Sequence, residues 1–86
     1  MNLMIFAIRD QKTDQFANPM FLITKAHAIR SFADAINEKD ANNQLRKHPE
    51  DFEMFHLGEY NTNTGEIIPT RPTSVATATE LFVKEQ

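Results

Sequence analysis

The chain contains no cysteine, so neither disulfides nor thiolate metal sites can support its fold. Its only glycines are Gly58 and Gly65, which excludes a glycine-rich loop that would cradle phosphates. A cysteine nucleophile is excluded as well, and Ser31 and Ser74 lie outside any nucleophile-elbow motif. These absences predict a protein that is not an enzyme, with no catalytic residues and no bound cofactor.

Long apolar runs are also missing. The run from Leu3 to Ile8 follows no basic residue and is too short for a signal peptide or a membrane span, so we expect a soluble cytoplasmic protein. A chain of 86 residues buries roughly 60 to 65% of the surface that its unfolded form exposes. We therefore expect one domain over residues 1–86, with a compact core over about 1–70 and a C-terminal extension over 71–86. So small a core gains from burial against a partner, which favours a homodimer.

Positive charge is scarce, because nine basic residues face twelve acidic ones and the net charge is −3. This balance argues against a protein that binds nucleic acid by covering its phosphates with Lys and Arg. A local basic face remains an alternative to an ordinary solvated surface, since most basic residues lie in the first two thirds of the chain. The residues expected to contact nucleic acid are Arg9, Lys12, Lys25, Arg30, Arg46, Lys47 and the aromatic Tyr60.

Aromatic side chains offer a second route to nucleic acid, because unpaired bases stack on exposed rings. Phe16, Phe21, Phe55 and Tyr60 would supply such a platform if one face of the sheet were open. The competing interpretation places most phenylalanines in the core of a small domain. Tyr60, beside a polar turn, is the aromatic residue that we most expect to be exposed.

Hydrophobic periodicity in the first half predicts a hairpin followed by a helix. Residues 3–8 and 20–24 form two strands around a polar turn, and Phe16 extends the second strand. Thr24 suits an N-cap, and apolar side chains then recur every three or four positions. This spacing predicts an amphipathic helix over about residues 25–38.

The second half predicts two more strands. Pro49, followed by two acids, suits the first turn of a helix, and residues 54–60 then alternate as a strand does. In that strand, His56 is expected on the outer face, opposite Phe55 and Leu57.

The remaining chain predicts a short fourth strand over residues 66–68, which Pro69 and Pro72 end. The tail alternates as a strand would, yet a short helix over about Thr79 to Lys84 is the favoured interpretation. The predicted fold class is α+β: an antiparallel sheet of about four strands with one amphipathic helix packed on it, in β-β-α-β-β order.

The stretch HPEDFEMFHLGEY, residues 48–60, holds two histidines and four carboxylates, which are residue types of metal sites and acid–base pairs. His48 precedes a proline in a connector, and no paired-ligand motif such as HExxH is present. Glu53 and Glu59 would need a pocket that separates their pKa values, and a domain this small has little room for one. We expect residues 48–60 to have a structural role, with no metal site and with Phe52 anchoring the turn in the core.

Seven short motifs follow one another along the chain: AIRD at 7–10, QKT at 11–13, PMF at 19–21, AIRSF at 28–32, KHPEDF at 47–52, LGEY at 57–60 and TGE at 64–66. KHPEDF, LGEY and TGE are fairly specific as a set. In the order of these motifs, over roughly residues 4 to 68, the chain resembles the small nonstructural protein of the gokushoviruses, a group of single-stranded DNA phages in the Microviridae.

This resemblance implies a nonstructural accessory protein of the host cytoplasm that acts in genome replication or in the switch to single-stranded DNA synthesis and packaging. Binding of single-stranded DNA is one way to fulfil that role, and a clustered basic face would favour it. The alternative is a protein–protein interaction module that binds a host or phage replication protein without contacting DNA. An exposed apolar patch or a free sheet edge would favour this second function.

Overall fold

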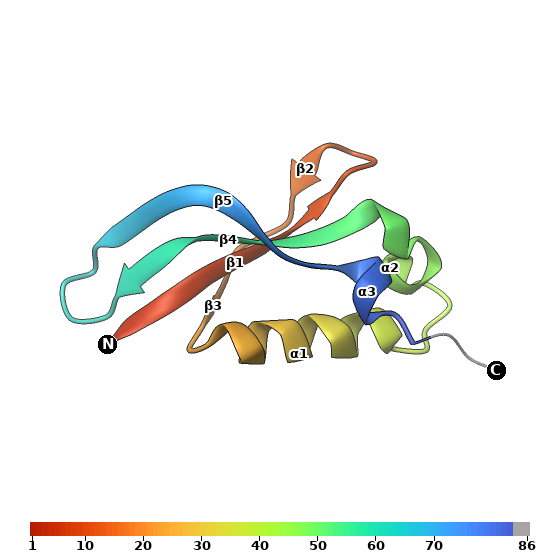
Figure 1. Ribbon diagram of the computed structural model, residues 1–86, viewed down its shortest axis with the longest axis horizontal. Coiled ribbons are helices and arrows are strands. Elements are labelled where there is room, and N and C mark those ends of the chain that lie inside the picture. The colour runs from red at the N-terminus through yellow and green to blue at the C-terminus, as the bar shows by residue number, and fades with distance from the viewer. Residues whose placement is uncertain (84–86) are drawn as a thin grey trace.

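The computed structural model describes residues 1–83, which form one antiparallel sheet with helices packed against it (Figure 1). The α+β class and the packed helix are therefore confirmed. None of the helices in the described part of the chain is long and apolar enough to cross a membrane. The elements are β1 (Asn2–Asp10), β2 (Gln15–Phe16), β3 (Met20–Leu22), α1 (Lys25–Asn37), α2 (Gln44–Lys47), the 3₁₀ helix η1 (Pro49–Asp51), β4 (Phe52–Asn61), β5 (Ile67–Thr77) and α3 (Ala78–Leu81).

The sheet has five strands rather than about four, because the second strand of the first hairpin is divided. The strand order is β2-β1-β4-β5. β3 also pairs with β1, along a different part of that strand from β2. The backbone N–H of Ala17 still donates to Ile8, at 2.8 Å, but Pro19 has no N–H to continue the ladder. The hairpin strand therefore splits into β2 and β3 around residues 17–19.

Helix α1 covers one face of the sheet and builds the core. The Thr24 hydroxyl accepts a hydrogen bond from the His27 N–H at 3.1 Å, which satisfies an otherwise unpaired donor of the first turn. Both the predicted cap and the predicted helix are confirmed, and the helix ends at Asn37. Its apolar stripe packs against the sheet, and the fully buried cluster consists of Phe6, Ala28, Phe32, Ile36, Met54 and Ala78.

The prediction of a short fourth strand over residues 66–68 is wrong in length, because β5 runs from Ile67 to Thr77, through Pro69 and Pro72. This continuation is possible because β5 is an edge strand, where a missing N–H can face away from the ladder. Its register against β4 shifts twice, between His56 and Gly58 and between Met54 and Phe55. Such bulges absorb residues that do not fit the ladder.

Part of the predicted C-terminal extension over residues 71–86 packs against the core. Ala76 and Ala78 are buried, and Ala78 belongs to the core cluster. Thr77 caps α3 in a capping box with Glu80, and hydrogen bonds from the Thr77 side chain and backbone lower the pKa of the Glu80 carboxyl. The predicted tail helix is thus present at Ala78–Leu81, and its expected end at Lys84 lies outside the described residues.

The prediction that His56 points outward is wrong. His56 lies on the same face as Met54, with its ring centroid 5.5 Å from that of Phe6, and its Nε2 atom is buried without a hydrogen-bond partner. Phe55 takes the opposite face, where its ring contacts Phe16. A period of two shows that a strand has two faces but does not show which one the helix covers.

Gly58 is required where β4 passes β5. Its φ is +152°, and an added Cβ would overlap the carbonyl oxygen of Ile68. We expect Gly58→Ala to lower the free energy of unfolding by roughly 2 to 4 kcal/mol, through strained backbone and overpacking. Gly65 is the matched control, because it also has a positive φ but no atom within 4 Å of the added Cβ, so Gly65→Ala should cost only about 1 kcal/mol. Urea titrations that gave equal losses would contradict this close approach.

Candidate nucleic-acid interface

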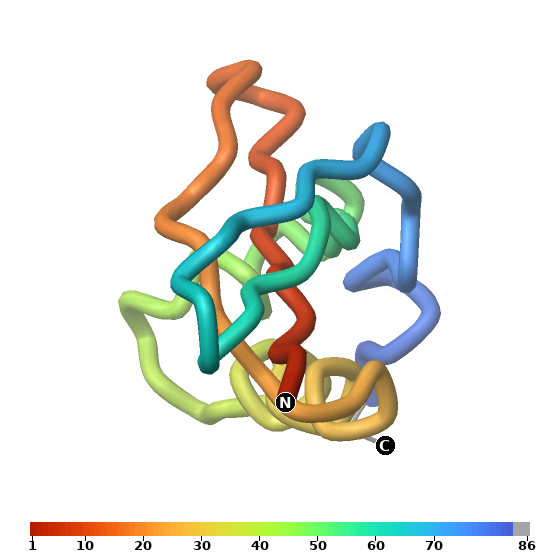
Figure 2. Tube along the Cα trace, turned by 90° about the vertical axis from the view of Figure 1, so that its left-hand side faces the viewer, coloured from red at the N-terminus to blue at the C-terminus, as the bar shows by residue number. Residues whose placement is uncertain are grey.

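The face of the sheet opposite α1, here called the open face, collects aromatic side chains from three strands. Directly paired residues of antiparallel strands share a face, so the register assigns each side chain. Figure 1 and Figure 2 both place α1 and the β1–β2 hairpin on opposite sides of the sheet. The register puts these residues on the open face: Leu3, Ile5, Ala7 and Arg9 of β1, Phe16 of β2, Phe21 of β3, and Glu53, Phe55 and Tyr60 of β4.

Two edge-to-face ring pairs lie on the open face. Phe16 contacts Phe55 and Phe21 contacts Tyr60, each with ring centroids 5.6 Å apart and interplanar angles of 70° and 79°. Such pairs are favourable arrangements of aromatic rings. In each pair the phenylalanine of the β2 or β3 strand is the more exposed, since Phe16 is 45% exposed and Phe21 44%. The interpretation that places most phenylalanines in the core is therefore wrong for Phe16 and Phe21.

The spacing of the two exposed rings suits a short stretch of nucleic acid. Phe21 pairs with Ile5 and Phe16 with Arg9, so the two rings lie four positions apart along β1. At about 3.3 Å per strand residue this separation is roughly 13 Å. Successive bases of a stacked strand are about 3.4 Å apart, so the two rings are roughly four nucleotides from each other.

The charge on the open face is mixed rather than basic. Arg9 forms an ion pair with Asp14, which lies in the turn between β1 and β2. Glu53 of β4 lies opposite Arg9 of β1 in the strand register. Its carboxylate accepts hydrogen bonds from the Ser74 hydroxyl and, at 3.4 Å, from the Gln11 side-chain amide. Arg9 on this face thus has two carboxylates nearby. Sequence reasoning missed Asp14, although an acid in a polar turn five residues after Arg9 was visible.

The predicted basic residues do not gather on one face. Lys12 is exposed in the β1–β2 turn, close to Arg9 in the chain, whereas Lys25 and Arg30 lie on α1, across the sheet. Arg46 belongs to α2, where its guanidinium lies 5.5 Å from the Phe82 ring centroid and donates to the Asn37 carbonyl at 3.4 Å. Lys47, also in α2, is exposed. Of the predicted contact residues, the structure brings only Arg9 and Tyr60 onto the open face.

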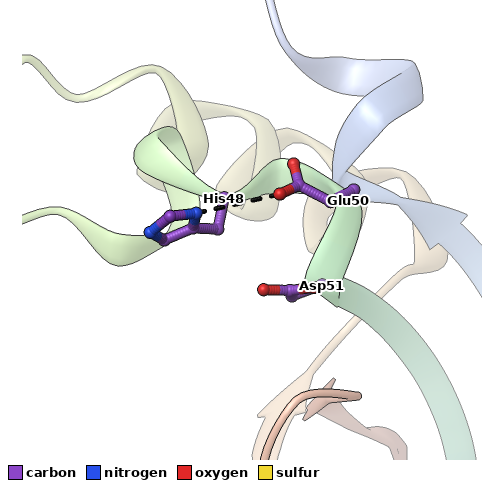
Figure 3. A group of neighbouring side chains, drawn as sticks. All are labelled: His48, Glu50 and Asp51. Atoms are coloured by element: carbon purple, nitrogen blue, oxygen red, sulfur yellow. Dashed lines mark ion pairs between the residues drawn. The ribbon is translucent and has the colours of Figure 1, made fainter.

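Three potential metal ligands meet at η1, where Figure 3 shows His48, Glu50 and Asp51. Their ligand atoms lie within 4.8 Å of one another, and His48 Nδ1 is 3.7 Å from a Glu50 oxygen. Lys12 borders the same shallow cleft of about 500 Å³. Both His48 and Glu50 are exposed, and structural zinc sites use four ligands that enclose the ion. The group could coordinate a cation weakly, and the expectation of no metal site stays a prediction.

Comparison with known proteins places the chain in a phage family. Residues 3–81 match the family model described as "Phage ORF5 protein". The chain is 28% identical over 71 residues to "Protein ORF5" of Chlamydia phage 1, a match that covers 80% of this chain and 74% of that protein. No solved structure matches the chain. The gokushovirus resemblance of its motifs is thereby confirmed, and the chain belongs to the phage ORF5 protein family.

Proposed function

We propose that this phage protein is a non-enzymatic accessory factor of genome replication in the host cytoplasm and binds single-stranded DNA on its open face. The observation that carries the proposal is the pair of exposed rings, Phe16 and Phe21, each supported from the side by a second aromatic ring. Covering single strands would fit a role in the switch to single-stranded DNA synthesis and packaging.

Base stacking explains why this face favours unpaired DNA. Every base has a flat π-face, so aromatic platforms bind single strands with little sequence preference. Sheets with one aromatic face and helices on the other use this mode of recognition for single-stranded nucleic acid. In a duplex the base faces are already stacked on each other and cannot reach Phe16 or Phe21.

The mixed charge makes stacking, rather than phosphate contact, the main source of affinity. Arg9 pairs with Phe16 on the open face, and Lys12 lies in the turn between β1 and β2. If one or two phosphates are neutralised, log K should fall with log salt with a slope of about −0.7 to −1.4. This shallow dependence reconciles DNA binding with a net charge of −3.

The test is a titration of labelled oligothymidine with the purified protein, followed by fluorescence anisotropy at several salt concentrations. We expect micromolar binding, a shallow salt slope and little binding to a duplex of the same length. Oligomers shorter than about four nucleotides should bind more weakly, because they cannot reach both rings. Absence of binding at low salt would refute the proposal.

A protein–protein interaction module is the second candidate. Ile67 and Ile68 are 61% and 47% exposed at the start of the edge strand β5, and exposed apolar residues on a sheet edge favour association. The same surface could serve the predicted homodimer. Sedimentation equilibrium of the wild type and of Ile68→Lys would test the self-association, because the substitution places a charge on this edge. Ile68 pairs with Glu59, on the face opposite the ring pairs, so its replacement should leave DNA binding unchanged.

A further inference from the structure

Arg9, the predicted contact cation that lies on the open face, already forms an ion pair with a carboxylate of the same chain. Arg9 is half-buried beside Phe16, and its guanidinium donates to the Asp14 carboxylate. The Asp14 side chain is 79% exposed, whereas that of Arg9 is 29% exposed. The carboxylate therefore approaches Arg9 from the solvent side, the side from which a DNA phosphate would also come.

We propose that Asp14 competes with the DNA backbone for Arg9 and so limits the affinity of the open face for single strands. This inference rests on the proposed function and adds a regulating residue to the same site. Carboxylate and phosphate oxygens bind a guanidinium in the same way, through charge-assisted hydrogen bonds. A phosphate that follows a base stacked on Phe16 must displace Asp14 before it reaches Arg9.

The geometry makes this displacement easy. Exposed ion pairs are weak because water and salt screen them, so Asp14 can swing into solvent at small cost. Glu53, the other acid beside Arg9, is instead held by Ser74 and Gln11. Asp14 is thus the carboxylate that exchanges with phosphate, while Glu53 stays part of the sheet surface.

The variant Asp14→Asn tests the competition with little disturbance of the turn. Asp14 has φ +60°, a left-handed conformation that Asn also tolerates. We expect Asp14→Asn to bind oligothymidine about 2- to 5-fold more tightly, because Arg9 no longer has to give up a weak ion pair.

Two further variants separate competition from net charge. Asp34→Asn makes the same charge change on the exposed side of α1, across the sheet, and should leave the Kd unchanged. In an Arg9→Gln background, Asp14→Asn should lose its effect, because no guanidinium remains to be freed. Circular dichroism spectra would verify that each variant is folded.

Each outcome separates this inference from the proposed function. Wild-type binding with no gain in Asp14→Asn would overturn the competition and leave the DNA-binding function intact. An equal gain in Asp34→Asn, or a gain that persists without Arg9, would also overturn it. If neither the wild type nor Asp14→Asn binds, both the function and the competition fail, whereas binding by Asp14→Asn alone would support the competition and refute the proposed function of the wild type.

Discussion

Replacing both Phe16 and Phe21 by alanine is expected to abolish most binding of single-stranded DNA. Alanine substitution of a stacking aromatic costs about 1 to 3 kcal/mol per base, so the double variant should lose about 2 to 6 kcal/mol of binding free energy. The two rings are exposed and lie outside the core cluster, so the fold should survive. Anisotropy titrations of the single and double variants would measure the loss.

The control for this experiment is Val83→Ala. Val83 is 67% exposed, and its N–H donates to Asn37 Oδ1 at 2.8 Å, at the C-terminal end of α1. It thus tests the loss of an exposed apolar side chain outside the open face, and its Kd should match that of the wild type. Each single variant, Phe16→Ala or Phe21→Ala, should also lose about 0.5 to 1.5 kcal/mol of unfolding free energy, because its aromatic ring pair is lost. A folded double variant with wild-type affinity would exclude the rings from the interface.

Replacing Phe32 by alanine is expected to cost about 3 to 5 kcal/mol of unfolding free energy. Phe32 is 1% exposed and joins α1 to Phe6 and Met54 in the core cluster. A domain of this size has a total stability of roughly 4 to 13 kcal/mol, so the variant loses a large share of it. Urea unfolding followed by far-ultraviolet circular dichroism would give the difference.

Phe52 provides the comparison within the same core. The sequence suggested that Phe52 anchors the turn before β4, and the structure confirms that it packs against the core cluster while remaining partly exposed. Phe52→Ala should therefore cost less than Phe32→Ala, because the transfer and cavity losses both fall with exposure. A larger loss for Phe52 would show that the core is centred on η1 rather than on α1.

Local patterns were sufficient for the elements whose signals lie within a few residues. The cap at Thr24 and the apolar stripe of α1 were readable because hydrogen bonds and side-chain periodicity in a helix act over three or four positions. Pro49 with two acids likewise predicted the single turn that became η1. The motif order also predicted the family.

Features that depend on long-range pairing were decided only by the tertiary structure. The inward orientation of His56 followed from the face that α1 covers, and β5 continued through Pro69 and Pro72 because it became an edge strand.

The open face illustrates the same difference. The sequence identified its four aromatic residues as candidates for base stacking. It could not show whether one face of the sheet is open to solvent. The sequence by itself determined which residues could stack with bases and which helix would form. Strand register, which joins residues up to tens of positions apart, decided that Phe16 and Phe21 share one face with Arg9. The predicted contact cations that lie on α1 and α2 are away from that face.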